Sequence, residues 1–262
     1  MESAFWAFVN GHFIGFSKDS RLPAEFDITE ALAKERSDES RTEVDENLMP
    51  VHELLVLVAR WSDGSYLEDQ DHWRMAGIHR PVDILRRPDK GSNILDFRVQ
   101  ADADGRLNIS VDVQTSVNEC YFLVALLFDD EQCDTFGGRQ SGDQVWSRTM
   151  PLNVSDACLD KNGVKTFELS EIVCDGTPKQ WTADNPNLYT LILALYKENE
   201  GSKPLQVESC RVGFRTVDII DGTLTINGKA VTVCGVNRHD HDPDKGKVVS
   251  VELMAREIQL LK

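Results

Sequence analysis

Near the start of the chain, two short apolar runs flank an Asn-Gly pair. Residues 3–9 and 12–17 are rich in aromatic and aliphatic side chains, and Asn10-Gly11 separates them. An Asn-Gly pair tolerates the positive φ angles of a two-residue turn, so the pattern predicts a β-hairpin. An isolated hairpin is marginal in water and needs neighbouring strands. The apolar runs 52–61 and 81–86 are predicted to be further strands.

From about residue 89, short alternating segments follow one another with turn residues between them. The clearest alternation of apolar with polar positions has its apolar side chains at Leu107, Ile109, Val111 and Val113. This period of two is typical of a strand that is buried on one face. Further strands fit residues 120–128, 143–149, 164–170, 187–196 and 205–212. About seven short strands over roughly 125 residues predict an immunoglobulin-like β-sandwich.

The last part of the chain changes from strands to a helix. A hairpin is predicted over 224–233 around Asn227-Gly228, followed by a polar loop rich in His and Asp. From residue 251 the apolar positions recur at helical spacing, and Ser250 is a suitable N-cap. A strand–loop–helix unit of this kind is expected to be the first βα repeat of a larger α/β domain, which would make the chain part of a longer protein.

Two polar stretches read as loops. Residues 33–47 are dense in charge and predict a solvated loop, and 136–143 hold three glycines and predict a flexible hairpin loop.

Charge and cysteine content narrow the classes of function. Lys and Arg total 28 against 44 Asp and Glu, for a net charge of −16, which disfavours nucleic acid and anionic membranes as partners. The six cysteines lack the spacing of a zinc site and read as thiols in a reducing compartment. The sequence shows no signal peptide and no apolar run long enough to span a membrane. A cytoplasmic location is therefore expected.

The stretch Arg60–Arg80 gathers carboxylates beside aromatic side chains. Its members are Trp61, Asp63, Tyr66, Glu68, Asp69, Asp71 and Trp73. Such a mixture suits carbohydrate, because carboxylates accept from sugar hydroxyls and rings stack on C–H edges. It equally suits a hard cation with oxygen ligands, although the spacing is not that of an EF-hand. A polar turn that caps backbone groups is the third interpretation.

A second candidate is Gly235–Pro243, in which His239 and His241 alternate with acidic side chains. Imidazoles in this setting can bind metal, move protons or hydrogen-bond a sugar. A zinc site would need a third ligand, and none is identifiable by spacing. A polar surface loop between a strand and a helix is an equally good interpretation.

These two stretches, together with three others, resemble the β-galactosidases of glycoside hydrolase family 2. The other three are Ser20–Asp27, Trp181–Tyr189 and Val212–Arg215. The last two are shared widely with β-glucuronidases and β-mannosidases, whereas Arg60–Arg80 is far more specific to β-galactosidases. Pro81 after Gly77-Ile-His-Arg is more like the glucuronidase branch, and Cys234 and Asp242 also depart from the usual β-galactosidase pattern.

The resemblance implies a mostly β architecture in three parts. Residues 1–88 would be part of a jelly-roll, sugar-binding-like domain, and 89–216 an immunoglobulin-like β-sandwich. Residues 217–262 would be the truncated start of the catalytic (β/α)8 TIM barrel.

The resemblance also implies site residues and ligands. Asp71 matches a carboxylate that holds sodium and contacts galactose, and His239 matches a histidine that binds substrate and supports the transition state. The family's two catalytic glutamates and its magnesium ligands would lie beyond residue 262, so no catalytic residue is expected here.

A longer protein would hydrolyse terminal β-galactosyl residues with retention, and a homo-oligomer is compatible with the family. This chain alone is expected to be inactive. The alternative is a non-catalytic carbohydrate-binding or complementing fragment.

Overall fold

A computed structural model describes most of the chain, in nine stretches: residues 1–34, 51–68, 74–87, 92–115, 120–129, 142–153, 163–173, 177–197 and 203–261. The contacts divide the chain into two compact units. The first consists of residues 1–84 together with 235–262, and the second of residues 85–234. The first unit is therefore built from two segments that are far apart in the sequence.

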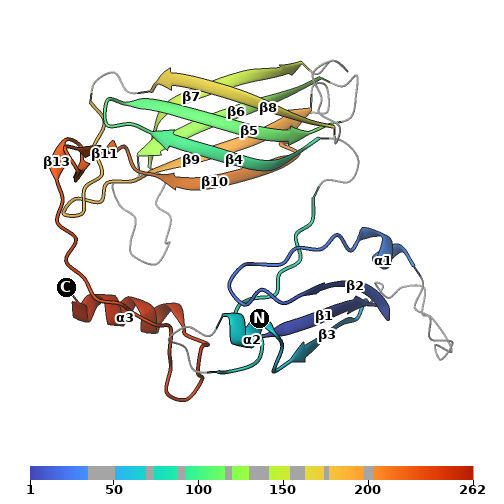
Figure 1. Cartoon of the computed structure of the whole chain (residues 1–262). Helices are drawn as coiled ribbons and strands as arrows, with labels where there is room; N and C mark the ends of the chain where they lie inside the picture. The colour runs from blue at the N-terminus through green and yellow to red at the C-terminus, as the bar shows by residue number, and fades with distance from the viewer. Residues whose placement is uncertain are drawn as a thin grey trace. The chain divides into compact units, whose positions relative to one another are not determined.

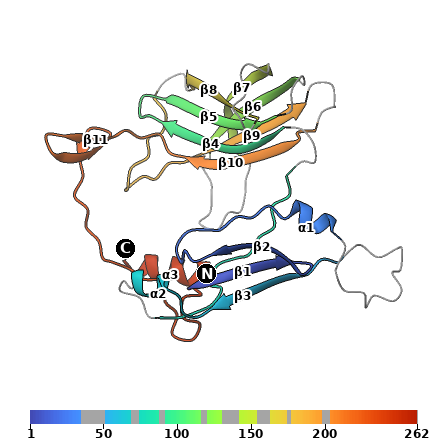
Figure 2. The ribbon, with the colours of Figure 1, turned by 45° about the vertical axis from the view of Figure 1, so that its right-hand side comes forward.

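The first unit contains a three-stranded antiparallel sheet in the order β2-β1-β3. Its strands are β1 (Ala4–Val9), β2 (His12–Ser17) and β3 (Leu54–Ala59). Three helices belong to the same unit: α1 (Thr29–Ala33), α2 (Gly64–Leu67) and α3 (Val251–Leu261). Both ribbon views place α3 beside α2 at one end of this sheet (Figure 1, Figure 2).

The predicted hairpin and the helix N-cap are confirmed. Asn10 and Gly11 form the turn with φ angles of 51° and 81°. The Asn10 side chain is buried, accepts a hydrogen bond from Glu53 N at 3.1 Å and donates to Ala31 O at 3.4 Å. One amide thus ties the turn to α1 and to the segment that enters β3. Ser250 Oγ accepts from Leu253 N at 3.2 Å, as an N-cap side chain should.

The predicted strand over 81–86 is wrong. These residues form no strand, and Ile84 and Leu85 are 72% and 75% exposed. Pro81 has no backbone N–H to donate to a sheet, and the described residues offer this segment no partner strand. Its apolar composition therefore does not produce a strand.

The second unit contains a β-sandwich, as predicted (Figure 1). One sheet has the order β4-β5-β8 and the other β10-β9-β6-β7. The first consists of β4 (Asn93–Ala101), β5 (Arg106–Gln114) and β8 (Val164–Ile172). The second consists of β6 (Cys120–Asp129), β7 (Asp143–Asn153), β9 (Tyr189–Lys197) and β10 (Gln206–Val212). All neighbouring strands pair antiparallel.

The core of the sandwich follows the alternation in the sequence. In β5 the inward positions are at most 2% exposed, and they are Leu107, Ile109, Val111 and Val113. The opposing sheet supplies fully buried leucines at Leu123, Leu127, Leu191, Leu193 and Leu195. Burial of side chains of this kind contributes about 1.5–3 kcal/mol each, so this layer is the main source of stability in the unit.

One packed cluster, called the joint, is formed by the motifs Trp181–Tyr189 and Val212–Arg215. Trp181 N donates to Phe214 O at 2.9 Å, and the Arg215 guanidinium lies 4.5 Å from the centre of the Trp181 ring. Phe214 is fully buried and meets Tyr189 edge to face at 5.1 Å. The Tyr189 hydroxyl in turn accepts from Lys179 N at 3.0 Å. These motifs therefore serve packing in this chain.

A small sheet follows this joint. It consists of β11 (Val217–Ile220), β12 (Thr223–Ile226) and β13 (Lys229–Ala230), with the β12–β13 turn at Asn227-Gly228 as predicted. Asn227 Oδ1 accepts from Thr216 N at 2.9 Å, and its Nδ2 donates to Trp181 O at 3.2 Å. Asn227 thus connects the small sheet to the joint.

Gly213→Ala is expected to destabilise the second unit by about 1–3 kcal/mol, as overpacking typically does. A methyl group at this position would lie 3.0 Å from Trp181 Cβ, and Trp181 is held in place by Phe214 and Arg215. The measurement is the opening free energy from amide hydrogen exchange in β5 and β9. The control is Gly235→Ala, where a methyl group would meet nothing within 4 Å. Equal stability of the two variants would contradict the role of the joint.

Tyr189→Phe is expected to lower the stability of the same unit by about 1 kcal/mol, the typical value of one hydrogen bond. The change removes the oxygen that accepts from Lys179 N and leaves the buried ring in place. Tyr196→Phe on the same strand is the matched control and is expected to be near neutral. Faster exchange of the Lys179 amide in the first variant alone checks the cause.

Candidate functional site

The first candidate stretch is organised by a stack of arginine and aromatic side chains. The Arg74 guanidinium lies 5.6 Å from the centre of the Trp61 ring and 5.7 Å from that of Tyr66. Arg60 lies over the same Trp61 ring at 5.6 Å. Cation–π contacts of this type stabilise by about 0.5–1 kcal/mol when exposed. Because Arg74 follows residues 69–73 and Trp61 and Tyr66 precede them, the stack joins the two ends of that segment.

Asp63 is a turn residue, in line with one of the three interpretations. It caps α2 by accepting from Gly64 N at 3.0 Å and pairs with Lys18 Nζ at 2.7 Å. The hydrogen bond from Lys18 and the positive charge of that side chain lower the pKa of the Asp63 carboxyl. The Asp63 carboxylate is therefore used in local structure.

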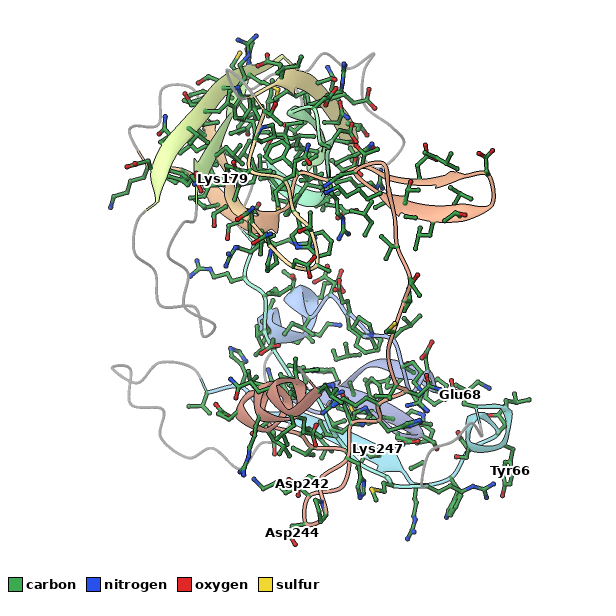
Figure 3. The ribbon with its side chains drawn as sticks, turned by 90° about the vertical axis from the view of Figure 1, so that its left-hand side faces the viewer. Tyr66, Glu68, Lys179, Asp242, Asp244 and Lys247 are labelled. Atoms are coloured by element: carbon green, nitrogen blue, oxygen red, sulfur yellow. The ribbon has the colours of Figure 1, made fainter. Side chains whose placement is uncertain are left out.

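Asp71, the predicted sodium and galactose ligand, lies outside the described residues, as do Asp69 and Trp73. Glu68 directly precedes that segment, and Figure 3 shows it with Tyr66 at α2. One oxygen of the Glu68 carboxylate is buried and has no hydrogen-bond partner among the described residues. A cation or a hydrogen-bond donor stabilises a buried carboxylate oxygen of this kind.

The second candidate stretch, Gly235–Pro243, contains no helix or strand. Asp242 Oδ1 accepts from Asp244 N and Lys245 N, each at 2.9 Å, and closes a turn. These two backbone bonds lower the pKa of the Asp242 carboxyl. Figure 3 shows Asp242 and Asp244 at the tip of this loop. Asp242 is thus a structural residue, while the His239 side chain is exposed.

The residues on either side of His239 belong to a chain of four charged side chains. Arg238 donates to Asp240 and, through Nε at 2.9 Å, to Glu257 on α3. On its other side, Asp240 accepts from Arg80 Nη2 at 2.6 Å. Hydrogen bonds from Arg238 and then Arg80 lower the pKa of the Asp240 carboxyl, and Glu257 and Asp240 raise that of the Arg238 guanidinium. The Asp240 carboxylate and the Arg238 guanidinium are therefore charged at neutral pH.

Further contacts join this loop to the N-terminal segment of the unit. Lys247 pairs with Glu2, and their side chains are only 10% and 18% exposed. Glu2 also exchanges two backbone hydrogen bonds with Gly77, at 3.1 and 2.9 Å. Gly246 has φ +64°, and a methyl group there would lie 2.6 Å from Met75 Sδ. The loop that carries His239 is thus fixed to residues 2 and 75–80.

Sequence reasoning did not identify Arg80, Arg238, Lys247 or Glu2 as site residues. Arg80 stands in the stretch singled out for its carboxylates, and Arg238 is next to His239, but neither spacing shows a contact across the sequence. Among the described residues, no group of three or more His, Cys, Asp or Glu could hold a metal ion. In that same part of the chain, no helix has the length and apolar character needed to cross a membrane.

Three protein-family models match most of the chain. The models that match are "Glycosyl hydrolases family 2, sugar binding domain" over 1–88, "Glycosyl hydrolases family 2" over 143–215 and "Glycosyl hydrolases family 2, TIM barrel domain" over 217–262. Their order along the chain is that of the sequence-based interpretation.

Curated relatives match the whole chain. A protein named "Beta-galactosidase" from Enterobacter cloacae is 37% identical over 268 residues, and one of the same name from Pectobacterium atrosepticum is 38% identical over 267 residues. Each alignment covers 100% of this chain and 23% of the relative. The chain therefore spans about a quarter of the length of these proteins.

Solved structures share the fold at low sequence identity. A β-glucuronidase from Bacteroides uniformis has a TM-score of 0.69 at 16% identity, covering 99% of this chain and 29% of that one. A putative β-galactosidase from Bacteroides fragilis has a TM-score of 0.65 at 15% identity, covering 99% and 36%. Together with the family matches, this agreement confirms the mostly β fold class. The chain belongs to glycosyl hydrolase family 2, of which it contains the sugar-binding domain, the immunoglobulin-like domain and the start of the TIM barrel.

Proposed function

We propose that this chain is the N-terminal part of a retaining β-galactosidase and that it is inactive without the rest of the catalytic barrel. The observation that carries this proposal is the 37–38% identity to proteins named β-galactosidase along the entire chain. The stretch Arg60–Arg80, whose motif is the most specific to β-galactosidases, supports the same substrate. A retaining mechanism needs two carboxyl groups about 5–5.5 Å apart, which the remaining barrel would supply.

In this proposal Asp71 contacts both galactose and a sodium ion. Sodium is a hard cation that prefers oxygen ligands, and carboxylate oxygens suit it. The buried oxygen of Glu68, which lacks a partner among the described residues, supports an electropositive occupant near this segment. When bound, the ion would supply positive charge that draws sugar hydroxyls toward it.

His239 would bind the sugar from the loop that precedes α3. Its exposure leaves the imidazole accessible, and loops of this position carry the active sites of TIM barrels. An imidazole that donates a hydrogen bond to a sugar hydroxyl lowers the barrier if the bond strengthens in the transition state. Magnesium is proposed for the complete enzyme, with ligands outside this chain.

A carbohydrate-binding role for the chain itself is the second candidate, favoured by the match of residues 1–88 to a sugar-binding domain. Isothermal titration of galactose into the purified chain separates the two. Millimolar or tighter binding that Asp71→Asn abolishes would favour a binding module. No heat of binding is the result expected if the site is completed by the barrel.

The purified chain is expected to release no product from a chromogenic β-galactoside above the rate in buffer. Double displacement requires a pair of carboxylates, and in this proposal both belong to the rest of the barrel. Release of nitrophenol is followed by its absorbance. Turnover that survives repurification and is lost on heating would overturn the proposal of inactivity.

In the protein completed with its barrel, Asp71→Asn is expected to weaken both the sodium dependence and the binding of galactosides. The amide keeps the shape of the side chain and removes the charge that attracts the cation. Initial rates across a sodium titration measure the effect. Asp63→Asn is the control, because Asp63 caps α2 and pairs with Lys18, so folding should change more than affinity. An unchanged sodium response and KM in Asp71→Asn would show that the role is misplaced.

His239→Ala in the same completed protein is expected to lower kcat/KM. The loss of transition-state stabilisation should be about 2–4 kcal/mol, which is typical of one lost donor. Steady-state kinetics on the purified variant provide the measurement. A wild-type kcat/KM would remove His239 from the proposed site.

A further inference from the structure

The loop of residues 238–247 is anchored to Arg80 at both ends and, through Lys247, also to Glu2. At its start, Arg80 Nη2 donates to Asp240 Oδ2 at 2.6 Å. At its end, Arg80 Nη1 donates to Lys247 O at 3.3 Å, and the Lys247 side chain pairs with Glu2. One guanidinium therefore contacts both arms of the loop. A planar fork of donors suits this task, because it can serve two acceptors at fixed angles.

His239 lies between two side chains that this arrangement holds in place. Arg238 is fixed by Glu257 of α3 and by Asp240, and Asp240 is fixed by Arg238 and Arg80. The backbone on either side of His239 is thus constrained from two directions, from α3 and from the segment that ends at Arg80. The side chains of Arg238 and Asp240 are 26% and 32% exposed, so water screens these contacts less than it screens fully exposed pairs.

We infer that Arg80 is a positioning residue for His239, through which the sugar-binding domain sets the conformation of the first loop of the barrel. Arg80 does not need to touch substrate for this role. It restricts the loop so that the imidazole is already in place when a sugar arrives, which reduces the entropy lost on binding. The role of the loop in sugar binding rests on the proposed function, whereas the contacts of Arg80 do not depend on any substrate.

The test is amide hydrogen exchange of the 262-residue chain, measured by mass spectrometry on peptides that cover the 238–247 loop. Arg80→Gln removes the charge and the fork, and exchange in the loop is expected to rise about tenfold or more, as local opening becomes easier. Arg80→Lys keeps the charge but can reach only one acceptor, so an intermediate rate is expected. Arg256→Gln on α3, an exposed arginine of the same unit, is the matched control and should leave the loop unchanged.

A double-mutant cycle isolates the contact between the two side chains. Asp240→Asn is expected to raise exchange in the loop, and the double variant with Arg80→Gln should lower the opening free energy by less than the sum of the two single effects, because each change already removes their shared contact. Wild-type exchange in Arg80→Gln would overturn the inference. So would equal rises in the loop and in β1–β3, since that result means loss of the whole unit and not of a local anchor.

The kinetics of the completed protein separate this inference from the proposed function. If both hold, Arg80→Gln lowers kcat/KM and Arg80→Lys restores part of it. If His239→Ala leaves kcat/KM unchanged while Arg80→Gln still loosens the loop in the exchange experiment, the positioning stands and the role of His239 fails. If His239→Ala is impaired and Arg80→Gln keeps both wild-type exchange and wild-type kcat/KM, the positioning is wrong and the function stands.

Discussion

Charge pairs connect the two segments of the first unit across a long gap in the sequence. Two pairs, Lys247 with Glu2 and Arg80 with Asp240, join the segment that precedes residues 85–234 in the sequence to the segment that follows them. The Lys247 and Glu2 side chains are only 10% and 18% exposed, so removal of one partner would leave a poorly solvated charge. The Arg80 side chain is 55% exposed, so its pair with Asp240 contributes less energy and acts mainly by fixing the geometry of two acceptors.

Where local chemistry decides the structure, the sequence was sufficient to predict it. The Asn10-Gly11 and Asn227-Gly228 turns, the alternation in β5 and the Ser250 cap all depend on neighbouring residues, and all are confirmed. The run 81–86 failed because apolar composition says nothing about whether a partner strand is available. β4 and β11 were not predicted individually, although Phe97, Val99 and Ala101 of β4 do alternate with polar residues.

The roles of Asp71 and His239 stay predictions, and the contacts that organise the candidate site could not be predicted from the sequence. Motif resemblance selected Asp71 and His239, and the acidic residues around them looked equivalent in the sequence. The structure separates those that it describes by their partners: Asp63 pairs with Lys18, Asp242 closes a turn, and Asp240 joins two arginines. Pairings such as Arg80 with Asp240 depend on the tertiary fold, and no spacing rule could have supplied them.

The two-segment construction of the first unit has a consequence for the order of events during biosynthesis. Residues 1–84 leave the ribosome first, yet their counterpart at 235–262 is translated only after the whole β-sandwich. At typical elongation rates this delay is on the order of ten seconds, which is long compared with the folding time of a small β domain. During that interval the pairs of Glu2 with Lys247 and of Arg80 with Asp240 cannot form, because their second partners are not yet synthesised. Translation speed through residues 85–234 thus sets how long the first segment of the unit stands without its second.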